Sequence, residues 1–223
     1  MKTKFLILLM GVLLYATGAQ AQANSPAPTR PDFLYSNRFS LLFGLIQPTT
    51  LGGGNVEVNY FTKRLSFDYS HGFSLDPPVV GDFKDNKLAL HLPFSTGFGV
   101  GYRFSSFFDV RFEPKLHSWE VYAEGKDQAG GNRLAAFKTF TLGIGAYYRY
   151  MPFKNSESKV LQGLTTSTSV RYWQNVGSTP SNDEFSFTNR ETGKKELLKV
   201  PNIGVANSPI IVNVAVGYTF GGK

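Results

Sequence analysis

An alternation of apolar and polar residues near the end of the chain constrains the fold more than any other feature. In segment 210–220 every second residue is large and apolar, whereas the residues between are small or polar. The apolar members are Ile210, Val212, Val214, Val216, Tyr218 and Phe220. This period of two is typical of a β-strand with two unlike faces. About eight such faces occur along the chain, too many for it to bury in its own core, so they require lipid.

The same alternation returns in earlier segments. The predicted strands are 39–45, 56–60, 65–73, 94–104, 107–122, 140–150 and 164–175. Their connections are alternately long and short, as in membrane barrels with short periplasmic turns and longer outer loops. We therefore predict an all-β fold, an eight-stranded antiparallel up-and-down transmembrane β-barrel over residues 38–220, whose last strand pairs with the first. A soluble sandwich or lipocalin-like barrel is the alternative. The face with the charges also carries the glycines, however, which fits a narrow lumen better.

Two local features refine this pattern. The apolar face of segment 107–122 uses even positions, but Trp119 and Val121 are odd, so we expect a β-bulge near Ser118. In the longest connection, 176–209, residues 183–200 are expected to form a hairpin that rises beyond the membrane.

The first 21 residues have the features of a secretory signal peptide. Two lysines precede a short apolar run, and Ala19-Gln20-Ala21 offers a cleavage site. We expect residues 22–37 to be a periplasmic N-terminal lead-in and residues 221–223 a C-terminal tail. The chain has no cysteine, so neither a lipoprotein anchor nor a disulfide is available.

The charge and the aromatic content limit which partners and surroundings fit the chain. Removal of Lys2 and Lys4 with the signal lowers the formal charge from +7 to +5. This modest positive excess is weak evidence for a nucleic-acid partner, and export makes such a partner implausible. The 20 Phe and 11 Tyr are more informative, because membrane barrels carry aromatic girdles at both interfaces. The predicted membrane aromatic anchors are Phe67, Tyr69, Tyr102, Tyr148, Tyr218 and Phe220.

Three segments give the chain a resemblance to a known class. They are Gly99-Val-Gly-Tyr-Arg-Phe104, Gly143-Ile-Gly-Ala-Tyr-Tyr-Arg149 and Val216-Gly-Tyr-Thr-Phe220. With them the chain resembles the small eight-stranded outer-membrane proteins of the OmpA transmembrane-domain, OmpX and OmpW kind. The resemblance implies the outer membrane of a Gram-negative bacterium, contact with lipid and lipopolysaccharide, and insertion by the barrel-assembly machinery. In such proteins the final aromatic residue is part of the assembly signal; here Phe220 is followed by three more residues.

Charged residues on the inward parity are the first candidate site. They are Glu57, Asp68, Asp109, Arg111, Glu113, Lys115, Arg149 and Arg171. Charges in a low-dielectric interior are costly unless paired, so we expect an interlocked network that fixes strand register. A small gated pore, in which the network rearranges, is the alternative.

The histidines are the second candidate. His71, His91 and His117 are expected at the outer rim, near serines and acids. A lipid A-modifying hydrolase or acyltransferase would use His as base and Ser as nucleophile. Parity places His71 on the lipid face and His117 in the lumen, however, so we predict no catalytic site, no metal site and no cofactor.

The outer loops are the third candidate, because a protruding hairpin can offer a strand edge to a partner. The sequence thus favours a non-enzymatic outer-membrane barrel with a structural or surface-interaction role, with an envelope protein as a further partner. A minor channel for small or hydrophobic solutes and a lipid A-modifying enzyme are the alternatives.

Overall fold

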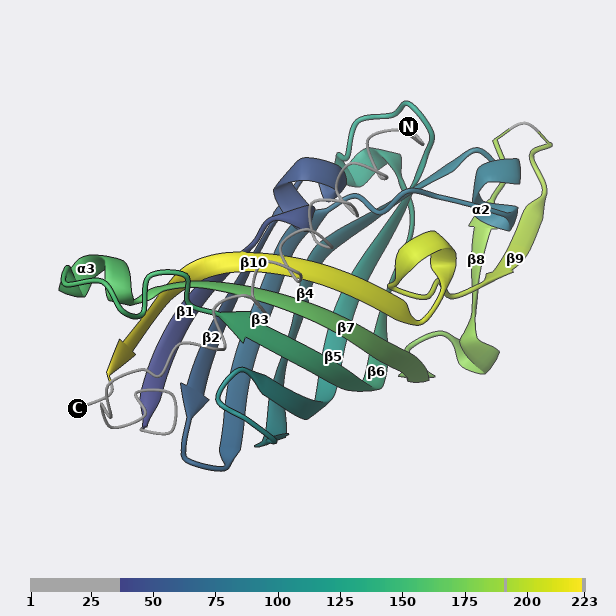
Figure 1. Ribbon diagram of the computed structural model, residues 1–223. Helices are drawn as coiled ribbons and strands as arrows, with labels where there is room; N and C mark the ends of the chain where they lie inside the picture. Colours follow the sequence, from purple (N-terminus) through teal and green to yellow (C-terminus); the bar gives the residue numbers. More distant parts are fainter. Residues whose placement is uncertain (1–36, 191, 222–223) are drawn as a thin grey trace. The chain divides into compact units, whose positions relative to one another are not determined.

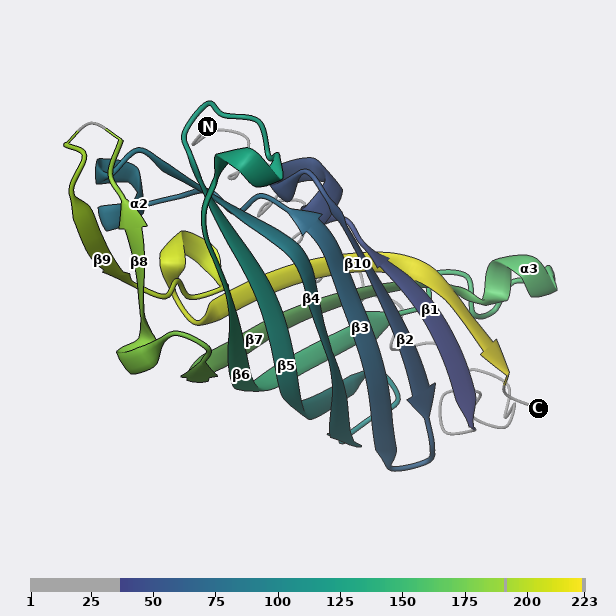
Figure 2. The same ribbon diagram turned by 180° about the vertical axis from the view of Figure 1, so that it is seen from behind.

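The computed structural model describes residues 37–190 and 192–221, and within them eight antiparallel strands close a barrel (Figures 1 and 2). The strands are β1 (Arg38–Gly44), β2 (Gly54–Phe61), β3 (Leu65–Leu75), β4 (Leu88–Arg103), β5 (Phe108–Ala123), β6 (Arg133–Tyr150), β7 (Leu164–Ser178) and β10 (Ile210–Gly221). Each pairs with its neighbour in the chain, and β10 returns to β1. The predicted eight-stranded antiparallel barrel is therefore confirmed. The predicted signal peptide and all but the last residue of the lead-in lie outside the described residues.

Strand β10 closes the barrel by pairing with β1, as predicted. Phe39 lies opposite Phe220, and Phe43 lies opposite Val216. On its other side β10 pairs with β7, from Ile210 opposite Tyr172 to Tyr218 opposite Leu164. Both backbone edges of the last strand are thus paired, which leaves no free edge there for uncontrolled pairing.

The connections define two unlike ends of the barrel. The turn end holds the connections 62–64, 104–107 and 151–163, the last of which contains α3 (Lys159–Gln162). The loop end holds the other four. They contain η2 (Gln47–Leu51), α2 (Asp82–Asp85), η3 (Gly130–Asn132), η4 (Ser181–Asp183), β8 (Glu184–Thr188), β9 (Lys195–Lys199) and η5 (Val205–Asn207). Among the described residues, no helix is both long enough and apolar enough to cross a membrane.

The hairpin predicted over 183–200 is present. Strands β8 and β9 form a two-stranded sheet of their own, with Glu184 opposite Lys199 and Thr188 opposite Lys195. In both ribbon views this hairpin stands beside α2 at the loop end (Figures 1 and 2).

The bulge predicted near Ser118 is wrong. Strand β5 keeps its alternation, and Trp119 and Val121, both fully buried, continue the inward parity of Asp109. What changes near Ser118 is the chemistry of the interior, from charged to apolar. The register shifts instead in β4, between His91 and Phe94, and between β5 and β6 at their loop ends.

The shift in β4 explains why this strand begins before the predicted start at residue 94. Leu88, Leu90 and Leu92 are buried at even positions, whereas beyond the shift the odd position Ser95 faces inward. An extra residue in a strand reverses the face of everything that follows it. The alternation in the sequence is therefore interrupted at this point, although the strand itself is continuous.

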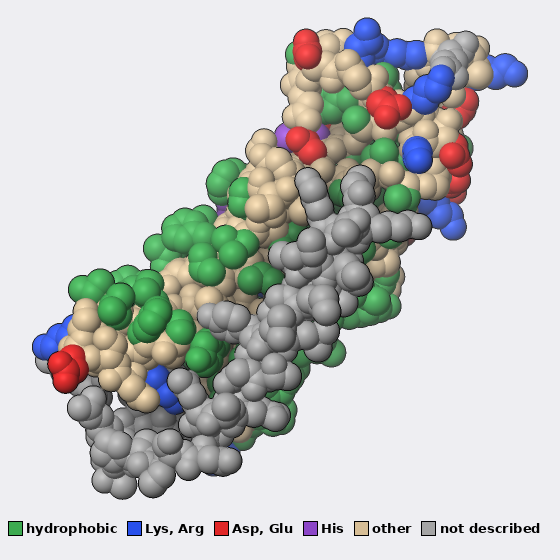
Figure 3. All heavy atoms as spheres, turned by 45° about the horizontal axis from the view of Figure 1, so that its top comes forward, with side chains coloured by type: hydrophobic (Ala, Val, Ile, Leu, Met, Phe, Trp, Pro, Cys, Tyr) green, Lys and Arg blue, Asp and Glu red, His purple; other side chains and the backbone are tan. Residues whose placement is uncertain are grey.

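Burial is inverted relative to a soluble barrel. Along β6, Phe140, Ile144 and Tyr148 are 40–61% exposed, whereas the alternate residues Thr141 and Tyr147 are at most 1% exposed. From Phe140 to the end of β6 the strand climbs roughly 25 Å at ~3.3 Å per residue and ~40° tilt, the height of the apolar band of a membrane barrel. On the face drawn in Figure 3, hydrophobic side chains gather along the barrel, and charged ones gather toward its two ends.

Candidate functional site

From the turn end to the middle of the barrel, the interior is an ion-pair layer centred on Arg111 of β5. Its Nε lies 2.6 Å from Asp109 Oδ2, and its Nη1 lies 3.0 Å from Glu57 Oε1 and 3.2 Å from Asp68 Oδ1. The same Nη1 donates to Asn59 Oδ1 at 2.7 Å. One guanidinium therefore connects strands β2, β3 and β5 across the lumen.

The remaining predicted lumen residues extend this layer. Arg171 Nη2 lies 3.2 Å from Glu57 Oε2, and Arg149 Nη1 lies 2.8 Å from Asp109 Oδ1. Lys115 Nζ lies 3.7 Å from Glu113 Oε1 and also contacts Ser70. The structure brings all eight predicted residues together, and each is at most 7% exposed. Because each of these charges has an opposite charge nearby, the attraction within the pairs offsets the cost of burying them.

Aromatic side chains that were not predicted from the sequence extend the layer. The Tyr147 hydroxyl donates to Glu113 Oε1 at 2.6 Å, and Trp173 Nε1 donates to Glu113 Oε2 at 3.1 Å. The Arg111 guanidinium lies 3.8 Å from the centre of the Tyr147 ring, a cation–π distance. Tyr147 and Trp173 share the parity of their charged neighbours Arg149 and Arg171, a signal that was available in the sequence.

Above the charged layer, at the loop end, the interior becomes apolar. We call its buried residues the apolar plug: Leu75, Phe83, Leu88, Leu90, Leu92, Trp119, Val121, Phe137, Phe185 and Phe187. Ring contacts join its parts, with Phe137 and Phe185 4.8 Å apart and Phe83 and Phe185 6.1 Å apart. Trp119 Nε1 donates to Thr139 Oγ1 at 2.9 Å, so the one polar atom of this indole is satisfied. Residues of α2 and β8 thus pack against the inward-facing apolar side chains of β4, β5 and β6 at the loop end.

The hairpin β8–β9 has one buried and one exposed face. Phe185 and Phe187 point into the apolar plug, whereas Leu197 is 63% exposed. Lys195 and Lys199 share the exposed face with Leu197, since the side chains of a strand alternate. The exposed face of the hairpin therefore carries Leu197 between two lysines, with Glu184 opposite Lys199.

The three histidines do not converge. His71 lies on the outer face of β3, and its ring centre is 6.4 Å from those of Phe73 and Phe94. His91 Nδ1 lies 2.7 Å from Asp76 Oδ1 at the loop end. The predicted outer-rim cluster is thus not assembled as a group.

His117 lies inside the barrel and forms a pair with serine. Its Nδ1 is 2.8 Å from Ser95 Oγ, and its Nε2 is 2.9 Å from Thr141 Oγ1. The ring is fully buried between the charged layer and the apolar plug. Both ring nitrogens are used by hydroxyl groups, which satisfies a neutral imidazole. Within the described residues, no group of His, Cys, Asp and Glu has the geometry to hold a metal ion.

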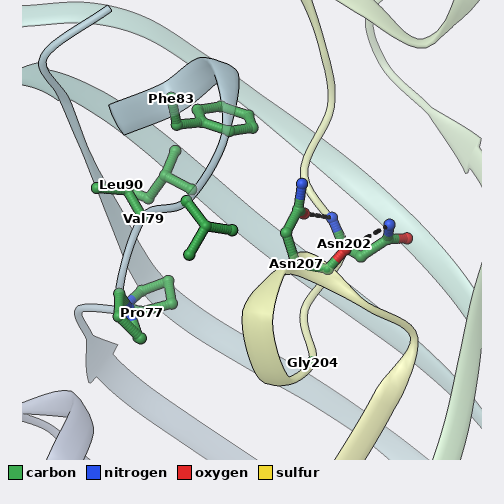
Figure 4. A pocket seen from close by; sticks show the side chains of 9 residues that line it. Pro77, Val79, Phe83, Leu90, Asn202, Gly204 and Asn207 are labelled. Atoms are coloured by element: carbon green, nitrogen blue, oxygen red, sulfur yellow. Dashed lines mark hydrogen bonds between the residues drawn. The ribbon is translucent and has the colours of Figure 1, made fainter. Parts of the chain in front are cut away.

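A small hollow lies at the loop end between the β3–β4 connection and the segment before β10 (Figure 4). Its volume is about 10 Å³, room for a single water molecule. Apolar side chains such as Val79 and Phe83 line one side, and Asn202 and Asn207, which hydrogen-bond to each other, line the other. The hollow is too small for a substrate.

The predicted aromatic anchors all lie on the outer face of the barrel. Tyr102, Tyr148, Tyr218 and Phe220 are near the turn end, and rings there touch in pairs such as Tyr218–Phe220, with centres 4.7 Å apart. Phe67 and Tyr69 lie further along β3, and the Tyr69 hydroxyl accepts a hydrogen bond from Thr96 Oγ1.

Comparison with known proteins adds no assignment: no family model and no curated protein matches the chain.

Proposed function

We propose that the chain is an integral outer-membrane barrel that is closed to solutes and acts structurally or through its loop end. The observation that carries the membrane assignment is the inverted burial: ion pairs inside and large apolar side chains outside. Ile144 and Phe98 are each 61% exposed, and such a band around a soluble protein would drive aggregation. Lipid and lipopolysaccharide are its natural surroundings, with the barrel-assembly machinery as its partner during insertion.

The two interior layers argue against the channel alternative. An eight-stranded barrel is just wide enough for side chains to fill, and here the ion-pair layer and the apolar plug fill successive levels. We expect the purified protein to form no conducting pore in planar lipid bilayers. Discrete, reproducible single-channel steps from folded, heat-modifiable protein would contradict this part of the proposal.

A lipid-modifying enzyme is less favoured by the geometry. The Ser95–His117 pair is enclosed in the barrel, and a fully buried imidazole cannot reach a lipid ester at the outer face. Lipid A from cells with and without the protein should therefore have the same acyl pattern by mass spectrometry.

The exposed face of β8–β9 is the best candidate for contact with an envelope partner. The hairpin pairs only within itself in the described part of the chain, and β8 lies against β6, so the edge of β9 is the one available for a strand from another protein. A photo-crosslinker at Leu197 should capture the partner in native envelopes. The same group at Leu198, which packs partly against the apolar plug, is the matched control and should give much less product. Equal products at both positions would remove the hairpin as the contact surface.

A further inference from the structure

The connection between β6 and β7 is unlike the other two connections at the turn end. Residues 62–64 and 104–107 are tight turns, whereas residues 151–163 form a longer segment with α3 at its end. Figures 1 and 2 show α3 projecting away from the barrel beside β10. Val160 is 71% exposed and Leu161 is 40% exposed, so both residues of the helix present apolar surface that no described residue covers.

Two contacts place α3 next to the outer face of the barrel rather than under the lumen. Tyr218, on the outward face of β10, donates its hydroxyl hydrogen to the Lys159 carbonyl at 3.0 Å. The amide of Thr219 donates to the Gly163 carbonyl at 2.7 Å, which fixes the other end of the helix. A side chain at Gly163 would overlap the Tyr218 ring, so the segment is seated closely against this aromatic residue. The apolar side chains of α3 therefore continue the lipid-facing surface of β10.

Lysines predominate on this connection, where Lys154 and Lys159 are exposed together with one acid, Glu157. Arg64 is exposed in the β2–β3 turn, at the same end of the barrel but across it from the β6–β7 connection. Arg64 Nη1 donates to the hydroxyl of Tyr102, an outward-facing residue, at 2.7 Å. Lysine and arginine beside a tyrosine girdle suit the headgroup level of a bilayer, and anionic lipids attract them.

Resting on the membrane assignment made above, we propose that residues 151–163 form an interfacial anchor on the lipid leaflet at the turn end. Val160 and Leu161 enter the upper acyl region, while Lys154 and Lys159 stay at the phosphates. A short amphipathic segment binds a membrane in this way when apolar burial and attraction to anionic headgroups act together. The occupant of this surface is thus a phospholipid leaflet that contains anionic lipid.

Single-cysteine variants test the anchor directly, because the chain has no cysteine of its own. An environment-sensitive fluorophore is attached at Val160→Cys, at Ile144→Cys in the apolar band, and at Thr192→Cys on the loop end. The folded full-length protein is reconstituted in symmetric vesicles, so that orientation does not matter. Nitroxide lipids labelled near the headgroup should quench the probe at 160 most strongly, lipids labelled deep in the chains should quench the probe at 144, and the probe at 192 should remain unquenched.

The outcomes separate the anchor from the membrane assignment. Quenching at 144 without quenching at 160 would overturn the anchor and leave the inserted barrel intact. An unquenched probe at both positions would overturn both. Strong cross-linking between two copies through position 160, with no quenching there, would assign this surface to a second copy of the chain.

The role of charge has its own test. Quenching at 160 is compared in phosphatidylcholine vesicles and in an equimolar mixture with phosphatidylglycerol. Substitution of Lys154 and Lys159 by Gln should abolish the gain in quenching that the anionic lipid produces. The same change at Lys194 and Lys195, on the loop end, should leave that gain unchanged. A gain that persists after the Lys154 and Lys159 substitutions would refute the headgroup contact.

Discussion

Asp109 and Arg111 lie two positions apart on β5, and Arg111 Nε is 2.6 Å from Asp109 Oδ2. Both side chains point into the lumen because residues i and i+2 of a strand share a face. Asp109 also lies 2.8 Å from Arg149 Nη1, and Arg111 reaches Glu57 and Asp68. A same-strand pair thus connects the ion pairs of four strands, and the interior acts as one electrostatic unit.

Substitution of Arg111 by Met should strongly destabilise the barrel. It removes the central cation and leaves three carboxylates with fewer partners in a buried layer, so we expect a loss of about 3–5 kcal/mol in the free energy of unfolding. The measurement is guanidinium-induced unfolding in detergent micelles. Arg133→Met is the matched control, because Arg133 pairs with Glu120 while 43% of its side chain is exposed, and its loss should be about 0–1 kcal/mol. Similar losses for the two variants would show that the buried layer does not stabilise the fold.

The interior glycines make room for the large side chains opposite them. A Cβ at Gly143 would overlap the Trp173 ring, and Trp173 is held by its hydrogen bond to Glu113. Gly143→Ala should therefore cost about 1–3 kcal/mol through overpacking, measured by the same unfolding experiment. Gly177→Ala is the control, since a Cβ there meets no atom within 4 Å, and we expect a change below about 0.5 kcal/mol. A stable Gly143 variant would mean that Trp173 can move aside.

The parts of this structure that alternation determines were predictable from the sequence. Once the turns set the register, parity places Glu57, Arg111 and Arg171 in the lumen and Phe220 outside. Charge then identifies the lumen face, because the outer face of the same strand segments carries large apolar side chains instead.

The apolar plug was not predictable in the same way. Leu88, Leu90 and Leu92 alternate like lipid-facing residues, yet they point inward. A period of two separates the faces of a strand but does not say which face is inside when the usual polar marker is missing. The bulge in β4 also reverses the parity, so counting residues back from the β4–β5 turn does not give the correct face for these leucines. Only the presence of Phe83, Phe185 and Phe187 from the connections, a tertiary feature, makes the inward side apolar.

The apolar plug should hold the β8–β9 hairpin in place. Replacement of both Phe185 and Phe187 by Ser removes two rings that are at most 4% exposed, and each large-to-small change costs about 3–5 kcal/mol. Since ~1.4 kcal/mol is a factor of ten, a loss of about 3 kcal/mol already corresponds to roughly a hundredfold, and amide hydrogen exchange in β8 and β9 should accelerate by at least that much. Leu197→Ser, on the exposed face, is the control and should leave exchange nearly unchanged. Unaltered exchange in the double variant would show that the hairpin is stable by itself.

The assignment of the two ends predicts which positions are accessible on intact cells. Asn86, Asp127 and Thr192 lie on three different loop-end connections, and Lys63 lies in a turn-end connection. Short turns are periplasmic and long loops external in outer-membrane barrels, so cysteines at the first three positions should react with a membrane-impermeant maleimide in intact cells. A cysteine at Lys63, which is exposed to solvent in the fold, should react only after the outer membrane is permeabilised. Because Lys63, Asp127 and Thr192 are all exposed whereas Asn86 is half-buried, a difference between Lys63 and the two exposed loop-end sites reports the membrane barrier rather than burial. Labelling at Lys63 in intact cells, with Thr192 protected, would invert the topology, and labelling at all four would remove the membrane assignment itself.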